Sequence, residues 1–197
     1  MKRTGEPQRN TRIYWNYIYN TIGKDDEYWR KTSRFWFALE FVKDKDKFLD
    51  IGCGVGVLCD LVKKERKGCE IWGTDISDDA IKNNKKEKKG INFLHGYAGY
   101  QDKLPDNYFD VVFAGEIIEH MDDPSLLFKE AHRILKKKGK LIITTPIEDH
   151  VTSQEHVWYF DKDDMEKLYF DAGFKKIKFV KMPDMEHLLV FFVVGIK

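Results

Sequence analysis

The chain has 197 residues, of which 42% are hydrophobic and 34% are charged. The length suits one domain and is too short for two ordinary ones, and the composition is typical of a globular protein. Its 34 lysines and arginines nearly balance 33 aspartates and glutamates, leaving a formal net charge of +1, so no overall field favours a polyanionic partner.

Three further features bear on location. The longest apolar run, 188–194, is far shorter than the roughly 20 residues that span a bilayer. Residues 1–10 lack the apolar stretch of a secretory signal. The three cysteines have neither CxxC spacing nor a partnering histidine cluster, so we expect reduced thiols. These features predict a soluble, cytoplasmic protein with no membrane partner.

Residues 1–45 are treated as a helical lid or cap, because ten of the 28 aromatic residues lie between Tyr14 and Phe41. One interpretation is a helix packed on the sheet. The other is a lid over the ligand. The helical spacing involves Tyr28, Thr32, Phe35, Leu39 and Val42, with Trp29 and Trp36 a heptad apart, and the lid would turn Tyr14, Trp15 or Tyr19 toward the substrate.

Residues 46–197 alternate between predicted strands and helices. Ser77 and Asp161 are expected N-caps, and Pro124 is expected in a first helical turn. The predicted strands are 48–51, 70–74, 91–95, 108–114, 140–145, 175–181 and 187–195, and the predicted helices are 56–67, 78–90, 124–139 and 161–173. This order predicts an α/β fold, a Rossmann-like and mostly parallel seven-stranded sheet with helices on both faces and a C-terminal antiparallel hairpin.

A glycine-rich turn follows the first strand of this domain. Residues 48–56 read FLDIGCGVG, a hydrophobic strand running into a turn that opens a helix. Glycines allow backbone to approach a ligand, and a helix start presents unpaired N–H groups. Asp75 ends the next strand and could accept both ribose hydroxyls of an adenosine. The alternative is a turn needed only for helix–strand packing.

These motifs resemble the class I S-adenosylmethionine-dependent methyltransferases. Residues 49–56 are similar to that family's first motif, and residues 104–112 and 135–141 are similar to later ones. The resemblance covers roughly residues 46–180 and implies S-adenosylmethionine as the cofactor. A nicotinamide cofactor is disfavoured, because Val57 stands where GxGxxG needs its third glycine.

The resemblance also implies residues of the cofactor site. The first motif would surround the methionine part, and the end of the second strand would hold ribose and adenine. The family often has an acid near the adenine amine, and Tyr97 stands in that place here, so backbone groups would serve instead. The implied cofactor-binding residues are Asp50, Gly52, Cys53, Gly54, Gly56, Asp75, Ile76, Tyr97, Ala98 and Gly115.

The candidate catalytic residues are Glu116, His120 and His156. Residues 115–120 follow the fourth strand, so they should lie beside the transferable methyl group. Methyl transfer needs alignment of the acceptor and, for a hydroxyl, loss of a proton. His120 is the natural base, because its reference pKa is near 6.5. The alternative is a histidine that only packs the turn before Pro124.

A metal is a further hypothesis, which the sequence alone does not favour. Glu116, Glu119 and His120 stand at i, i+3 and i+4, so a helical turn starting at Glu116 would place them on one face. With His156 they could hold a divalent ion. The pattern is similar to that of metal-assisted small-RNA terminal 2′-O-methyltransferases and also occurs in quinone-type O-methyltransferases. Alternatively, Glu119 and His120 only order the turn.

The leading functional hypothesis is O-methylation of a small molecule such as a sugar, quinone or phenol. The long loop after residue 146 would shape its pocket with Ser153, Gln154 and Trp158. A nucleic acid methyltransferase is the first alternative, with lysine clusters at 82–89 and 136–140 that are better interpreted as solvated faces. A catalytically silent cofactor-binding subunit is the second. The sequence does not indicate an oligomeric state.

Overall fold

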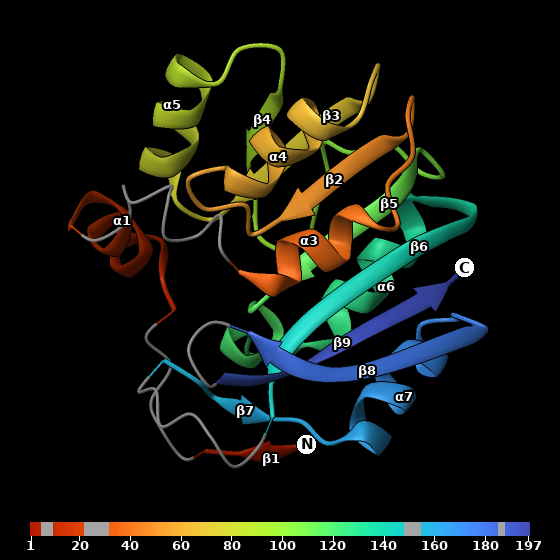
Figure 1. Ribbon diagram of the computed structural model, residues 1–197. Helices are drawn as coiled ribbons and strands as arrows, with labels where there is room; N and C mark the ends of the chain where they lie inside the picture. The colour runs from red at the N-terminus through yellow and green to blue at the C-terminus, as the bar shows by residue number, and fades with distance from the viewer. Residues whose placement is uncertain (5–9, 22–31, 148–154, 185–187) are drawn as a thin grey trace.

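The computed structural model describes residues 1–4, 10–21, 32–147, 155–184 and 188–197. Its main feature is a seven-stranded sheet with the order β4-β3-β2-β5-β6-β9-β8 (Figure 1). Neighbours from β4 to β6 pair in parallel, whereas β9 is antiparallel to both β6 and β8. The predicted fold is confirmed. The strands are β2 (Lys47–Ile51), β3 (Glu70–Asp75), β4 (Asn92–His95), β5 (Phe109–Gly115), β6 (Leu135–Pro146), β8 (Lys176–Asp184) and β9 (Leu188–Ile196).

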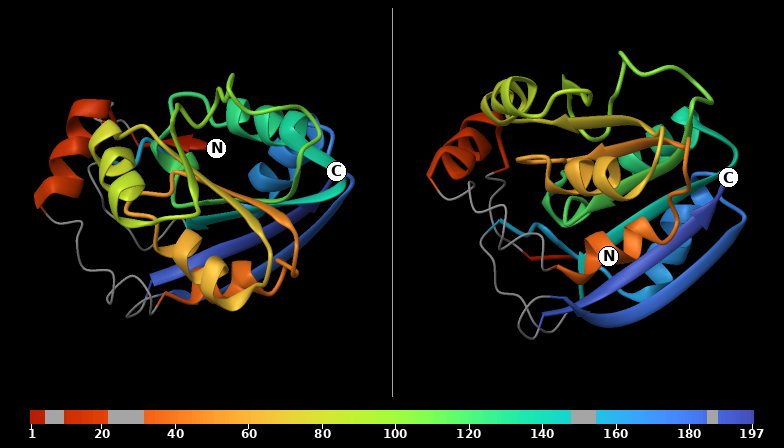
Figure 2. Two further views of the ribbon diagram at one scale, coloured as in Figure 1. Left: turned by 90° about the horizontal axis from the view of Figure 1, so that it is seen from above. Right: turned by 45° about the horizontal axis from the view of Figure 1, so that its top comes forward.

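Helices cover both faces of the sheet (Figures 1 and 2). Ala38 and Leu58 belong to one buried cluster, on the face that carries α3 and α4, and Ile81 of α5 joins it. Phe128 and Tyr169 belong to the other cluster, under α6 and α7. These helices are α3 (Ser33–Leu39), α4 (Val57–Glu65), α5 (Asp78–Glu87), α6 (Ser125–Ile134) and α7 (Lys162–Asp171).

Strand β5 shows how the sheet is buried. Val111 and Phe113 pack into the cluster under α3 and α4, while Val112 and Ala114 pack into the cluster under α6 and α7. Side chains of a strand alternate between faces, so a strand covered on both faces must be apolar throughout. The continuous apolar run predicted this central position. The carboxyl end of β5 thereby lies at the sheet edge where ligands of this fold bind.

Two helix starts follow their predicted caps. The hydroxyl of Ser77 accepts a hydrogen bond from the backbone N–H of Ala80 at 3.1 Å. Asp161 accepts from the backbone N–H of Asp164 at 2.8 Å, and the Asp164 carboxylate accepts in return from the N–H of Asp161 at 3.1 Å. Both arrangements satisfy N–H groups that a helix leaves unpaired.

The start of β6 differs from the prediction. The helix was expected to continue to Gly139, but α6 ends at Ile134 and β6 begins at Leu135. The Leu135 side chain is fully buried, and the backbone N–H of Tyr108 donates to the carbonyl of Ile134. Pairing with the neighbouring chain and burial of Leu135 therefore outweigh the helix propensity of the following lysines.

The N-terminal segment divides into two parts. Helix α1 (Arg12–Thr21) has no buried residue and lies beside α5, where Asn16 accepts from the hydroxyl of Ser77 at 2.7 Å. Helix α3 instead contributes Ala38 and Leu39 to the core. The segment thus contains one helix that packs into the core, α3, and one that does not, α1. The predicted positions Tyr28 and Trp29 lie outside the described residues.

Strand β1 (Lys2–Arg3) pairs antiparallel with β7 (Trp158–Tyr159), which sequence reasoning did not predict. Within the described ranges, no helix combines the length and apolarity needed to cross a membrane.

Candidate active site

The turn between β2 and α4 has three glycines in the left-handed region, with φ of 73° at Gly52, 49° at Gly54 and 76° at Gly56. Residues other than glycine rarely adopt these angles. A Cβ atom on Gly52 would lie 2.1 Å from Cδ1 of Ile117, and one on Gly54 would lie 2.9 Å from the hydroxyl of Tyr19. The turn therefore needs glycine for its backbone and for the space above it.

Asp75 lies at the end of β3 and faces this turn. Its carboxylate accepts hydrogen bonds from the backbone N–H groups of Gly54 and Ser77, both at 2.8 Å. Burial raises the pKa of Asp75, and these two hydrogen bonds oppose the rise. The hydroxyl of Tyr19 is a further hydrogen-bond donor to the same carboxylate. The predicted ribose acceptor is thus fixed in place by backbone.

Asp50 is the second buried acid of this region, with 3% of its surface exposed. Burial raises its pKa well above the ordinary value, and the charge of Asp75 raises it further. The thiol of Cys59 donates to it at 3.9 Å. Two carboxylates that repel each other in a site shielded from water favour a ligand that carries positive charge.

Two adjoining cavities contain most of the predicted cofactor residues. The first has a volume of about 230 Å³, and the second lies toward Asp75. Trp15, Tyr19, Gly52 and Ile117 line both. The predicted residues in the first are Asp50, Gly52, Cys53, Gly54, Gly115 and Glu116, and those in the second are Gly52, Asp75, Ile76, Tyr97, Ala98 and His120.

Gly56 lines neither of these cavities. A Cβ atom on Gly56 would lie 3.1 Å from the Lys88 side chain and 3.2 Å from the ring of Phe93. Its place in the motif therefore follows from close packing and from its positive φ, which is the interpretation that the sequence left open for the turn.

The segment after β5 does not form the predicted helical turn. Glu116 has φ of +56°, and the helix that follows is the short 3₁₀ element η1 (Ile118–His120). The prediction that Glu116 shares one helical face with Glu119 and His120 is wrong. The reason is tertiary: the backbone N–H of Glu116 donates to the carbonyl of Thr144, and its carboxylate accepts from the Thr144 hydroxyl at 3.1 Å.

Arg34 is a site residue that sequence reasoning missed. It comes from α3, lines the first cavity and is 7% exposed. Its Nη1 lies 2.7 Å from Oδ2 of Asp184 and 4.0 Å from Oε2 of Glu116. A basic residue among aromatics in the N-terminal segment was the available signal, but Asp184 is 150 residues away in sequence.

Glu119, His120 and His156 lie together, and His120 lines the second cavity. Their ligand atoms are within 4.8 Å of one another, and the two imidazole rings are 4.9 Å apart between centroids. The backbone N–H of Val157 donates to the carbonyl of Glu119 at 2.8 Å. The segment after residue 154 thus folds back onto η1. This brings His156 next to His120, as the metal hypothesis required.

The environment of these groups disfavours charge. Burial among Trp15 and His156 lowers the pKa of His120 to about 4, and burial also lowers the pKa of His156. Burial raises the pKa of Glu119 well above its ordinary value, with a further contribution from the charge of Glu116. Both imidazoles are therefore neutral near pH 7, the form that accepts a proton or binds a metal.

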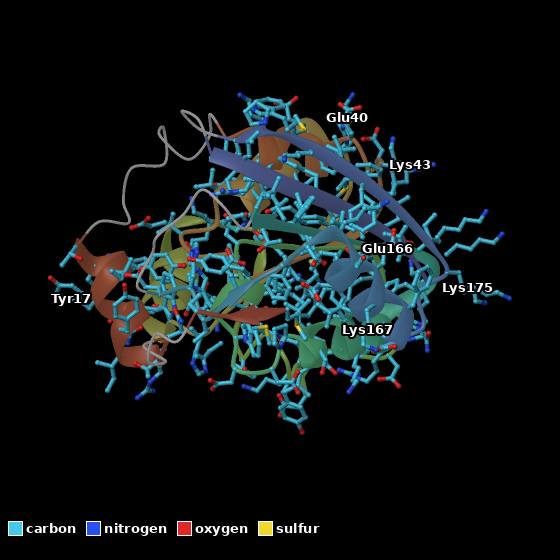
Figure 3. All side chains as sticks on the ribbon, turned by 90° about the horizontal axis from the view of Figure 1, so that it is seen from below. Tyr17, Glu40, Lys43, Glu166, Lys167 and Lys175 are labelled. Atoms are coloured by element: carbon cyan, nitrogen blue, oxygen red, sulfur yellow. The ribbon has the colours of Figure 1, made fainter. Side chains whose placement is uncertain are left out.

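The remaining predicted pocket residues divide between described and undescribed parts. Ser153 and Gln154 lie outside the described residues. Trp158 is described, and its indole N–H donates to the carbonyl of Met121 at 2.8 Å. The hydroxyl of Tyr14 donates to the carboxylate of Glu155. Trp15 and Tyr19 face the cavities, whereas Tyr17 on the same helix points away from the protein (Figure 3).

Part of the chain matches known proteins in sequence. The family described as Methyltransferase domain matches residues 49–143. The (S)-coclaurine N-methyltransferase of Papaver somniferum is 30% identical over 139 residues, 67% of this chain and 38% of that protein. The ubiquinone biosynthesis O-methyltransferase of Bradyrhizobium diazoefficiens is 31% identical over 101 residues, 50% of this chain and 39% of that protein. The chain thus spans about two fifths of the length of these curated relatives.

A solved structure of a SAM dependent methyltransferase from Archaeoglobus fulgidus is similar over 93% of this chain and 99% of that one, with a TM-score of 0.75 and 19% identity. The fold, the glycine turn and Asp75 define a Rossmann-like cofactor-binding protein. The chain is similar to the class I S-adenosylmethionine-dependent methyltransferases in sequence over residues 49–143 and in fold over most of its length.

Proposed function

We propose that the protein is an S-adenosylmethionine-dependent methyltransferase that transfers a methyl group to a hydroxyl of a small molecule. The methionine part of the cofactor binds at the glycine turn in the first cavity, its adenosine binds beside Asp75 in the second, and the acceptor binds where the two cavities adjoin, on the side of Glu116 and His120. In the reaction the acceptor oxygen forms a bond to the methyl carbon, the carbon–sulfur bond breaks, and the hydroxyl proton leaves. The products are a methyl ether and S-adenosylhomocysteine.

One observation carries the choice of cofactor. Asp50 and Asp75 are both buried at the glycine turn, where burial raises the pKa of each. S-adenosylmethionine brings a sulfonium and an ammonium group, so it relieves the repulsion between these carboxylates. A dinucleotide would instead bring an anionic pyrophosphate to them. The charge of the site therefore supports an adenosine with a cationic amino-acid tail.

The acceptor end of the site supports a hydroxyl acceptor. Glu116 lines the first cavity and His120 the second, and His156 lies against His120. A hydroxyl acceptor must lose a proton, and His120 and His156 provide ring nitrogens that can receive it, with a basicity that burial lowers. Trp15, Ile18 and Phe35 line the first cavity with apolar surface, which fits an aromatic or quinone-like acceptor.

The position of the lysines near the start of β6 disfavours a role for that basic surface in holding a nucleic acid acceptor. Lys137, Lys138, Lys175 and Lys176 line a groove at the start of β6 and β8, and Figure 3 shows Lys175 at the side opposite α1. The proposed active site lies at the other end of β6. A nucleic acid held by these lysines would be remote from the cofactor.

Mass spectrometry tests the proposed function. The protein is incubated with S-adenosylmethionine carrying a deuterated methyl group and with a panel of phenols, catechols, quinols and sugars. We expect a labelled methyl ether from at least one aromatic hydroxyl. Salt-dependent binding and methylation of RNA would favour the nucleic acid alternative. Tight cofactor binding without transfer to any acceptor would favour a silent binding subunit.

The reduced thiols Cys53 and Cys59 support a cytoplasmic location as part of this proposal.

A further inference from the structure

We infer that Glu119, His120 and His156 form a binding site for one divalent transition-metal ion beside the second cavity, which His120 lines. The inference deepens the proposed function and rests on it only for the role of the ion. Binding itself can be measured without methyl transfer.

Two buried atoms of this cluster have no hydrogen-bond partner. Among the described residues, Oε1 of Glu119 and Nδ1 of His156 neither accept nor donate a hydrogen bond. Glu119 is 1% exposed and His156 is 7% exposed, so neither atom is compensated by bulk water. Buried polar atoms in native proteins nearly always have a hydrogen-bond partner. Two neighbouring buried atoms that both lack one therefore indicate a bound group that is absent from the structure.

In Glu119 and in His120, one polar atom of the side chain is hydrogen-bonded to a neighbouring group. Oε2 of Glu119 accepts from the hydroxyl of Thr145 at 3.1 Å. Nδ1 of His120 lies 3.0 Å from the carbonyl of Glu155, to which it donates, so Nε2 of His120 carries the lone pair. Metal-binding histidines and carboxylates are commonly oriented in this way by a second hydrogen bond.

The geometry is close to that of a three-ligand metal site. The three ligand atoms lie within 4.8 Å of one another. Atoms bound to one ion at about 2.1 Å can be at most about 4.2 Å apart, a distance that small side-chain rotations reach. Two imidazoles and one carboxylate suit first-row ions such as Zn²⁺, Co²⁺ or Mn²⁺ better than Mg²⁺ or Ca²⁺.

The site differs from the pattern in the sequence. Glu116 is directed to Thr144 and the neighbourhood of Arg34, so it is not a ligand in this arrangement. Three protein ligands leave coordination positions open for an oxygen of the acceptor. An ion there would bind the hydroxyl, lower its pKa and hold the oxygen for attack on the methyl carbon.

Metal binding to the metal-free protein tests the inference. The full chain is dialysed against a chelator and titrated with Co²⁺, with visible absorption and calorimetry as readouts and with neither cofactor nor acceptor present. We expect one equivalent to bind at micromolar concentration or below, with a higher temperature of unfolding in excess Co²⁺. Glu119→Gln and His156→Asn should each weaken binding at least tenfold. His132→Gln, in α6, is the matched control and should bind as the unchanged protein does.

Two results of the Co²⁺ titration would overturn the inference. No binding at millimolar Co²⁺ overturns it, and so does binding that both site variants leave unchanged, which would be adventitious binding to the surface. Thermal unfolding of both variants shows that they are folded, and two different variants guard against the failure of one. Methyl transfer that persists after chelation in a protein that binds no Co²⁺ would overturn this inference and leave the proposed function standing. One bound Co²⁺ without methyl transfer would support this inference and oppose the proposed function.

Discussion

The hydroxyl of Tyr19 donates a hydrogen bond to the carboxylate of Asp75, which connects helix α1 to the end of β3. The same hydroxyl lies over Gly54, where a Cβ atom would be 2.9 Å away. The tyrosine thus holds the carboxylate that we assign to the ribose and covers the turn that we assign to the methionine part. Cofactor binding and the position of α1 should be coupled through this contact.

The first prediction concerns this contact. Ribose hydroxyls must replace the Tyr19 hydroxyl on Asp75, so Tyr19→Phe should bind S-adenosylmethionine a few-fold more tightly. A hydrogen bond from a hydroxyl to a carboxylate contributes about 1.5 to 3 kcal/mol, which sets an upper limit of roughly a hundredfold. Calorimetry measures the dissociation constant, and Tyr17→Phe on the exposed face of α1 is the matched control. Tenfold weaker binding would show instead that the hydroxyl contacts the cofactor.

The second prediction concerns Asp75 itself. Asp75→Ala removes charged hydrogen bonds to the ribose, each worth about 1.5 to 3 kcal/mol, so cofactor affinity should fall at least about tenfold. Asp75 also holds the N–H groups of Gly54 and Ser77, so thermal unfolding is measured beside binding. Asp171→Ala, on the surface of α7, should change neither. An unchanged dissociation constant in a folded Asp75→Ala protein would remove Asp75 from the ribose site.

The third prediction concerns helix α1. Deletion of residues 1–21 should leave the temperature of unfolding within a few degrees, because no residue of α1 is buried. Turnover should fall, because Trp15, Ile18 and Tyr19 line the first cavity. Extending the deletion to residue 40 should unfold the protein, since α3 provides Ala38 and Leu39 to the core. A short deletion that unfolds the protein would make α1 part of the core.

Local sequence signals predicted the features that local chemistry determines. The apolar run of β5, the caps Ser77 and Asp161 and the glycine turn each act over a few residues, and each lies where the sequence places it. The parallel pairing of the strands from β4 to β6 follows from the alternation of strands and helices, whereas the order of the strands was not predicted. Most of the implied cofactor residues line the two cavities because they sit on these elements.

Long-range contacts account for what the sequence did not predict. Glu116 takes a positive φ because Thr144, on the next strand, binds both its backbone and its carboxylate. The spacing of Glu116, Glu119 and His120 indicates a helix only when that strand is ignored. The contacts of Arg34 with Asp184 and of Tyr19 with Asp75 join residues that no periodicity relates.

The last prediction concerns the ion pair of Arg34 and Asp184. The two charges are 2.7 Å apart, and the Asp184 side chain is fully buried. Arg34→Ala would leave that buried carboxylate without its positive partner, with hydrogen bonds only from the Ser33 hydroxyl and the backbone N–H of residue 34, and breaking a buried ion pair costs about 3 to 5 kcal/mol. We therefore expect a decrease of this size in the free energy of unfolding, measured by urea denaturation. Lys167→Ala is the matched control, because its pair with Asp171 is exposed and should contribute less than about 1 kcal/mol. The double variant Arg34→Met with Asp184→Leu removes both charges and should recover most of the loss. A loss below 1 kcal/mol in Arg34→Ala would mean that water reaches Asp184, and that this end of the first cavity is open to solvent.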